Sequence, residues 1–134
     1  MRFTGIYRWI PALIWMIIIF VLSHQTGSEL DTYLPWAQRW LPWLDSFDVG
    51  HFFSYFILAC LIWWAMVSHR LAVSLFVVLL CILYGLTDEY HQSFVAGRTP
   101  DLLDIRNDSI GALLAMIFVR IPFIRNRTFA KRIP

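Results

Sequence analysis

Histidine, tyrosine and carboxylate side chains recur along the chain in pairs with helical spacing. The three pairs are His51 with Tyr55, Asp88 with His91, and Asp104 with Asp108. Residues three or four positions apart lie on the same face of a helix. Each pair borders an apolar stretch, and ionisable groups at membrane depth are costly and usually face a cavity or a partner. The pairs therefore predict one polar cluster where several hydrophobic helices end.

The first interpretation of this cluster is an acid–base or anion-binding site without a metal. His91 would carry a proton near neutral pH, and Glu89 would orient it or act as a base. Arg98 would clamp a phosphate or carboxylate group, and Asp88 would orient the reacting groups. Ser93 is close to His91, but proximity in the sequence does not make a nucleophilic triad. Further ligand-binding positions in such a pocket are His51, Tyr55, Asp104 and Asp108.

Two other interpretations of the cluster remain open. In the first, the cluster holds zinc or manganese, because its ligand types suit these metals. The candidate ligands are His51, Asp88, His91 and Asp104. The sequence has no HExxH or paired-cysteine pattern, so the metal and any cofactor stay unknown. In the second, Arg98 and Arg106 pair with the neighbouring carboxylates while His51 and Tyr55 bond across helices, which gives a structural polar plug.

The elements that must position these residues are hydrophobic helices. Hydrophobic residues make up 59% of the 134 residues and charged residues only 15%, whereas soluble domains carry about 25% charged residues. A bilayer core needs about 20 mostly apolar residues per helix. Four stretches approach this length: residues 6–23, 51–67, 71–87 and 109–124. We therefore expect an all-α fold, a four-helix transmembrane bundle that forms a single integral membrane domain over residues 1–134.

Two details of these spans are predicted from their flanking residues. Arg2 and Arg8 precede the first apolar stretch as they would in a signal peptide, but we expect the stretch to be retained as a span. Asp108, followed by Ser109, fits the N-cap of the fourth span.

Charge distribution predicts the orientation of the bundle. Basic residues concentrate at the N-terminus, in the turn between the second and third spans, and after the fourth: Arg2, Arg8, Arg70, Arg120, Arg125, Arg127, Lys131 and Arg132. Short basic loops stay on the cytoplasmic side, so both termini are expected in the cytoplasm. The acidic residues then all lie on the other side: Glu29, Asp31, Asp45, Asp48, Asp88, Glu89, Asp101, Asp104 and Asp108. This outer face is the expected working face.

Residues 24–47 are predicted to form a helical segment in the outer membrane interface. Apolar residues recur there at helical spacing, and three tryptophans accompany them: Leu30, Leu34, Ala37, Leu41 and Leu44, with Trp36, Trp40 and Trp43. Pro35 and Pro42 argue against one long helix. We expect one or two short amphipathic helices that form either an aromatic belt or a wall of a lipid-facing groove.

Three stretches resemble the VanZ-like membrane family: DVGHFFSYFILACLI from Asp48, LYGLTDEYHQSFVAGRTPDLLD from Leu83, and NDSIGALLA from Asn107. The family pattern falls on His51, Tyr55, Asp88, Glu89, His91, Gln92, Gly97, Arg98, Asp104, Asp108 and Gly111, and it adds Gln92 to the ligand-binding candidates. Ser23 and Gln25 also resemble the family. The chain departs from it at Val49, where family members often carry a lysine.

The resemblance implies a multi-pass protein of the bacterial cytoplasmic membrane, in a family linked to teicoplanin resistance. We expect such a protein to recognise or modify an outer-leaflet lipid or a lipid-linked cell-wall component. The alternative is a non-catalytic scaffold or partner-docking protein. Nucleic-acid binding is not expected, because the basic tail is short and follows the topology rule. The sequence leaves catalysis and oligomeric state open.

Overall fold

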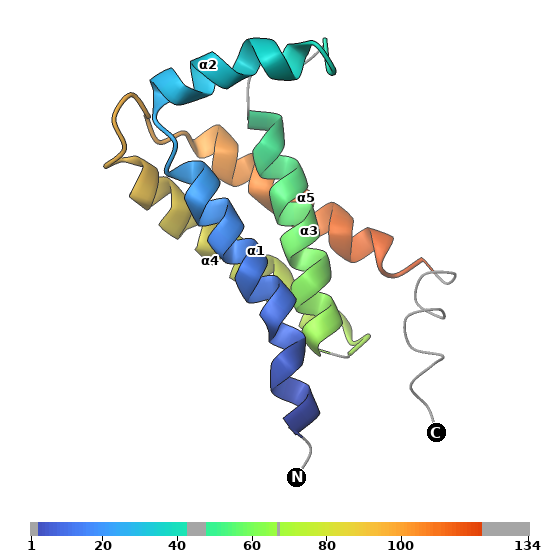
Figure 1. Ribbon diagram of the computed structural model, residues 1–134. Helices are drawn as coiled ribbons and strands as arrows, with labels where there is room; N and C mark the ends of the chain where they lie inside the picture. Colours follow the sequence, from blue (N-terminus) through green and yellow to red (C-terminus); the bar gives the residue numbers. More distant parts are fainter. Residues whose placement is uncertain (1–2, 43–47, 67, 122–134) are drawn as a thin grey trace.

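The computed structural model describes residues 3–42, 48–66 and 68–121, and this part of the chain contains helices and no strands (Figure 1). The elements are η1 (Phe3–Trp9), α1 (Ile10–Ser23), α2 (Gly27–Gln38), α3 (Asp48–Met66), α4 (Leu71–Gln92) and α5 (Leu102–Phe118). The predicted all-α helical bundle is confirmed.

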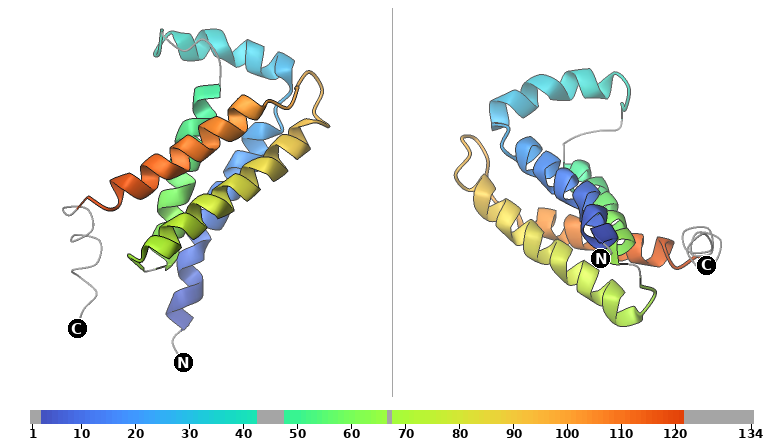
Figure 2. Two further views of the ribbon diagram at one scale, coloured as in Figure 1. Left: turned by 180° about the vertical axis from the view of Figure 1, so that it is seen from behind. Right: turned by 60° about the horizontal axis from the view of Figure 1, so that its bottom comes forward.

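Helices α1, α3, α4 and α5 form the bundle, and α2 lies across one end of it (Figures 1 and 2). The buried core lies between the four helices and includes Ala12, Ile19, Leu58, Ala59, Val77, Cys81, Ala112 and Ala115. Helices α3 and α5 approach closely at Gly111, where an added Cβ would lie 2.3 Å from the carbonyl oxygen of Phe52. Only a residue without a side chain fits such a crossing, so Gly111 sets how near α5 lies to α3.

Three helical segments are long and apolar enough to cross a membrane: Gly5–Ser23, Val49–Met66 and Leu71–Gln92. Helix α5 is not among them, since its 17 residues include Asp104, Arg106 and Asp108. The predicted count of four spans is therefore not exact in the part of the chain that the structure describes. Many apolar side chains on the bundle surface are exposed, including Ile14, Ile17, Leu75, Leu79 and Ile117, as expected for helices surrounded by lipid.

Helix α5 begins earlier than the sequence predicts. Asp101 is its N-cap, and the Asp101 carboxylate accepts a hydrogen bond of 2.8 Å from the backbone N–H of Leu103. Asp108 lies inside the helix, so the prediction that it caps a helix was wrong. The reason is that Asp101, earlier in the chain, already caps the helix by accepting a hydrogen bond from one of its first free N–H groups. The earlier start directs Asp104 and Asp108 into the bundle.

Helix α2 is the predicted short helix in residues 24–47, and it continues through Pro35. A capping box fixes its start. The Thr26 hydroxyl accepts a hydrogen bond from the backbone N–H of Glu29, and the Glu29 carboxylate accepts one of 2.8 Å from the backbone N–H of Thr26. This backbone hydrogen bond lowers the pKa of Glu29 below its usual value. The predicted positions Trp43, Leu44 and Asp45 lie outside the described residues.

The end of the bundle that α2 covers is called here the α2 end, and η1 lies at the opposite end (Figure 1). The last turns of α1 and α4 and the first turns of α3 and α5 meet at the α2 end. These turns, α2 itself and the connection from α4 to α5 contain the acidic residues described by the structure: Glu29, Asp31, Asp48, Asp88, Glu89, Asp101, Asp104 and Asp108. The fold thus collects the predicted site residues at one end.

Candidate functional site

His51 lies between two carboxylates of α5. Its Nδ1 is 3.2 Å from Oδ1 of Asp108, and its Nε2 is 3.7 Å from Oδ2 of Asp104. Asp104 and Asp108 are one helical turn apart, so they present both carboxylates to the same imidazole. The Asp108 side chain is fully buried. An added Cβ at Gly85 would lie 2.6 Å from Oδ2 of Asp108, so the glycine leaves room for this carboxylate between α4 and α5.

Glu89 contributes a third carboxylate from α4. Its Oε2 accepts a hydrogen bond of 2.9 Å from the backbone N–H of Asp101, the residue that caps α5. Its Oε1 is buried and accepts no hydrogen bond from the residues that the structure describes. One ligand atom from each of His51, Glu89 and Asp104 lies within 4.8 Å of the other two. Compared with the predicted metal ligands, this group keeps His51 and Asp104 and replaces Asp88 and His91 by Glu89.

Asp88 lies on another side of α4 and is held by α1. The hydroxyl of Ser23 donates a hydrogen bond of 2.8 Å to Oδ2 of Asp88, and both side chains are buried. Tyr55 is fully buried one turn after His51, and its ring centroid lies 6.0 Å from that of Tyr84. The Tyr55 hydroxyl has no hydrogen-bond partner among the described residues. Asp88 and Tyr55 therefore lie at the same end of the bundle as His51 and the carboxylates around it.

The two arginines in this region bind amide oxygens. Arg98 donates hydrogen bonds from both Nε and Nη2 to Oε1 of the buried Gln92, and Arg106 donates to the side-chain oxygen of Asn107. The structural interpretation predicts arginine–carboxylate pairs. For Asp88, Glu89 and Asp108, no ion pair with lysine or arginine forms within the described ranges.

The side chain of His91 contacts His24 and Phe20, and no hydrogen bond or ion pair joins it to a carboxylate among the described residues. Its Nε2 is 3.2 Å from Nδ1 of His24, and its ring centroid lies 4.4 Å from that of Phe20. Glu89 and His91 are two positions apart on α4, and such residues point to different sides of a helix. The structure thus brings His51, Asp104, Asp108 and Glu89 together but pairs His91 with a histidine of α1. His24 was missed because it lies just after the first apolar stretch, without a motif of its own.

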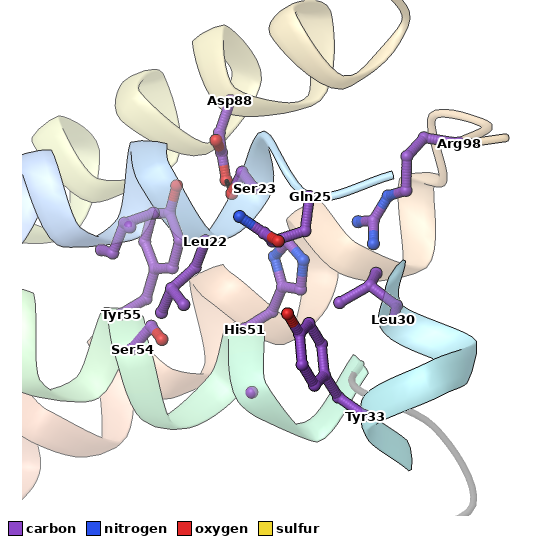
Figure 3. A pocket seen from close by; sticks show the side chains of 12 residues that line it. Leu22, Ser23, Gln25, Leu30, Tyr33, His51, Ser54, Tyr55, Asp88 and Arg98 are labelled. Carbon is purple, nitrogen blue, oxygen red and sulfur yellow. Dashed lines mark hydrogen bonds between the residues drawn. The ribbon is translucent and has the colours of Figure 1, made fainter. Parts of the chain in front are cut away.

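A pocket of about 470 Å³ opens beside His51 (Figure 3). Its lining comes from α1, α2, α3 and α4 and from the connections that follow α1 and α4: Ile19, Leu22, Ser23, Gln25, Leu30, Tyr33, Gly50, His51, Ser54, Tyr55, Asp88 and Arg98. Figure 3 shows the Tyr33 side chain directed from α2 toward His51, with Arg98 at one edge. The pocket is amphipathic, because aliphatic side chains of α1 and α2 face ionisable groups of α3 and α4.

Contacts between backbones hold α2 over this pocket. The backbone N–H of Gly27 donates a hydrogen bond of 3.2 Å to the carbonyl oxygen of Ala96. An added Cβ at Gly27 would lie 2.4 Å from the carbonyl oxygen of Gly97, which itself has a φ of +74°. The contribution of Leu30 and Tyr33 to a pocket could not be read from the sequence, because it depends on this contact with a distant loop.

Comparison with known proteins identifies the class of membrane protein that this fold and site represent. The family model VanZ/LLP1 matches residues 8–124, and the chain belongs to this family. It is similar to an uncharacterized protein of Schizosaccharomyces pombe, with 35% identity over 89 residues, which cover 66% of this chain. The matched region spans 54%, about half, of the length of that relative. No solved structure matches the chain.

Proposed function

We propose that this VanZ/LLP1 protein is a multi-pass protein of the bacterial cytoplasmic membrane that recognises or modifies an outer-leaflet lipid or a lipid-linked cell-wall component. The observation that carries the proposal is the amphipathic pocket at the α2 end, which adjoins a group of buried carboxylates through His51. Among the described residues, Arg8, Arg70 and Arg120 lie in η1, before α4 and after α5, away from the α2 end. Under the positive-inside rule, that opposite end is cytoplasmic. The pocket then opens at the depth of the outer lipid headgroups.

The lining of the pocket suits an amphiphile with an anionic headgroup. Ile19, Leu22 and Leu30 offer aliphatic surface to an acyl or prenyl chain. Arg98 lies at the edge, held through Gln92, with its charge balanced by no ion pair among the described residues. A partly exposed guanidinium is a strong site for a phosphate or carboxylate oxygen.

If the ligand is modified without a metal, His51 is better placed than His91 to carry the proton. His51 lines the pocket and contacts two carboxylates, one on each ring nitrogen. Such carboxylates orient an imidazole and stabilise its protonated form. In this scheme Asp88 lines the pocket. Glu89 does not line the pocket and lies beside His51 and Asp104. His91, on α4, contacts His24 and would only help to position the end of α1.

The scaffold alternative predicts complete pairing of the polar groups and no cavity. The 470 Å³ pocket and the arginine–amide contacts favour a binding site instead. Teicoplanin resistance would then be one consequence of lipid handling in a bacterial envelope.

Teicoplanin susceptibility of a sensitive Gram-positive host that expresses the chain tests this function. We expect the intact chain to raise the inhibitory concentration and His51→Ala and Arg98→Ala to abolish the increase. Arg39→Ala is the matched control, because Arg39 is an exposed arginine at the same end and does not line the pocket. All variants are compared at equal membrane levels. Equal protection by every variant would contradict the site, and no protection by the intact chain would remove resistance from the proposal.

A further inference from the structure

Buried negative charge gathers around a single imidazole at the α2 end. Glu89, Asp104 and Asp108 are at most 7% exposed and lie around His51. Removing a carboxylate from water costs several kcal/mol unless a cation or hydrogen bonds compensate. Among the described residues, Asp108 pairs with His51, whereas Glu89 forms no ion pair. Glu89 is therefore a buried carboxylate without a compensating cation.

Glu89 shows most directly where a further cation would bind. The residue is only 4% exposed, and its Oε1 has no hydrogen-bond partner among the described residues. Its other oxygen is fixed by the backbone N–H of Asp101. The Glu89 carboxylate is therefore buried and oriented, with one oxygen hydrogen-bonded and the other available to a ligand. One of its oxygens lies within 4.8 Å of ligand atoms of His51 and Asp104.

The surroundings of His51 match those of a metal-binding histidine. Such a histidine commonly donates its second ring N–H to a carboxylate, which fixes the tautomer and raises the basicity of the ligating nitrogen. Nδ1 of His51 lies 3.2 Å from the Asp108 carboxylate, so a proton on Nδ1 leaves the lone pair of Nε2 free. Nε2 lies 3.7 Å from the Asp104 carboxylate. Two ligands bound to one ion at about 2.1 Å lie about 3–4 Å apart.

We infer that His51, Glu89 and Asp104 bind a divalent first-row transition-metal ion, with Asp108 as the outer partner that orients His51. One imidazole and two carboxylates suit Mn²⁺ or Zn²⁺. Three protein ligands leave coordination positions for water or a ligand oxygen, as in catalytic metal sites. The inference stands on the geometry alone and does not require the proposed lipid.

Manganese binding to the purified chain, in detergent and with any histidine tag removed, tests the inference. Bound Mn²⁺ loses the sharp six-line electron paramagnetic resonance signal of the free ion, and Zn²⁺ is assayed by competition. We expect one ion per chain. Glu89→Gln and Asp104→Asn should weaken binding by more than the roughly 10–100-fold that loss of an outer partner costs, and Asp108→Asn by about that factor. Asp31→Asn, an exposed carboxylate of α2, is the matched control and should bind as the intact chain does.

Thermal unfolding with and without Mn²⁺ is the second measurement, because it also shows whether each variant is folded. Mn²⁺ should raise the thermal unfolding temperature of the intact chain and of Asp31→Asn, and leave that of Glu89→Gln unchanged. Two results would overturn the inference. One is an intact chain whose Mn²⁺ signal and unfolding temperature match those of Glu89→Gln. The other is binding that survives Glu89→Gln and Asp104→Asn but is lost in His91→Ala, which would place the ion at the His24–His91 pair.

Discussion

Nδ1 of His51 lies 3.2 Å from the fully buried carboxylate of Asp108, and this contact joins the first turn of α3 to the second turn of α5. The contact fixes which nitrogen of His51 faces Asp104. It also connects the packing of the bundle with the chemistry of the site, because the same two helices cross closely at Gly111.

The His51–Asp108 pair should contribute to stability as a coupled unit. His51→Ala and Asp108→Ala each leave a buried polar group without its partner, which costs about 1–3 kcal/mol. The double variant should lose less than the sum, with a coupling of about 0.5–3 kcal/mol. Unfolding free energies in mixed detergent micelles measure this cycle. Additive losses would show that the two side chains do not interact in the folded protein.

The crossing of α3 and α5 should tolerate no side chain at Gly111. Gly111→Ala places a methyl group against the carbonyl oxygen of Phe52, at 2.3 Å without rearrangement. Overpacking of this kind costs about 1–3 kcal/mol. Gly50→Ala is the matched control on α3, since nothing lies within 4 Å of its added Cβ. It should be neutral or stabilise by up to about 1 kcal/mol. Equal unfolding free energies for the two variants would refute the crossing.

The contact between Gly27 and Gly97 should keep α2 closed over the pocket. In a cysteine-free background, Leu30→Cys reports access to the pocket through its rate of maleimide labelling. Adding Gly27→Ala should speed labelling several-fold, because the new methyl group meets the Gly97 backbone at 2.4 Å. Gly5→Ala, whose Cβ meets nothing within 4 Å, should leave the rate unchanged. Unaltered labelling in Gly27→Ala would mean that α2 is held by other contacts.

The capping box of α2 predicts a pH-dependent term in stability. The backbone N–H of Thr26 lowers the pKa of Glu29 from its usual 4.5. A group with a lowered folded pKa stabilises the fold above its unfolded pKa, and the contribution is lost as the pH falls through the folded pKa. Glu29→Gln retains a cap acceptor that does not titrate. The intact chain should therefore exceed Glu29→Gln in stability near neutral pH, and the difference should shrink well below pH 4.5. Parallel pH profiles of the denaturation midpoint would contradict this role.

The proposed orientation places the turn before α4 in the cytoplasm and the connection from α4 to α5 outside. In a cysteine-free background expressed in bacteria, a membrane-impermeant maleimide added to intact cells should label Thr99→Cys and leave His69→Cys unlabelled. Both positions are exposed, so access alone does not distinguish them. Labelling of His69→Cys alone would invert the topology and move the pocket to the cytoplasmic face.

Hydropathy and helical spacing were sufficient to predict the helical bundle and the grouping of carboxylates at one end. The pairs His51 with Tyr55 and Asp104 with Asp108 share helix faces, as their spacing predicts. The start of α5 was placed too late because the apolar stretch begins after Asp108, whereas the helix begins at Leu102 beyond the Asp101 cap. An N-cap hydrogen bond contributes about 1 kcal/mol to helix stability, but a hydropathy pattern does not report it. The pattern therefore does not locate the start of α5.

The pairing of the site residues could not be predicted in the same way. His91 and Glu89 are neighbours in the sequence, but only the rotation of α4 decides that His91 faces His24 and that Glu89 faces Asp101. The preference of Arg98 for Gln92 likewise depends on the turn at Gly97. Such contacts depend on how helices and loops pack against one another. The spacing of residues along one helix carries no information about this packing.

The most direct test of the account is to identify what occupies the pocket in a bacterial membrane. A photo-crosslinking amino acid at Tyr33, which lines the pocket, is compared with one at Leu75, which is exposed on α4, and the captured lipids are identified by mass spectrometry. We expect one class of anionic lipid to be enriched at Tyr33 relative to Leu75. Arg98→Ala should remove the enrichment, and Arg39→Ala should leave it unchanged. The same lipid profile at both positions would contradict a selective lipid site at the α2 end.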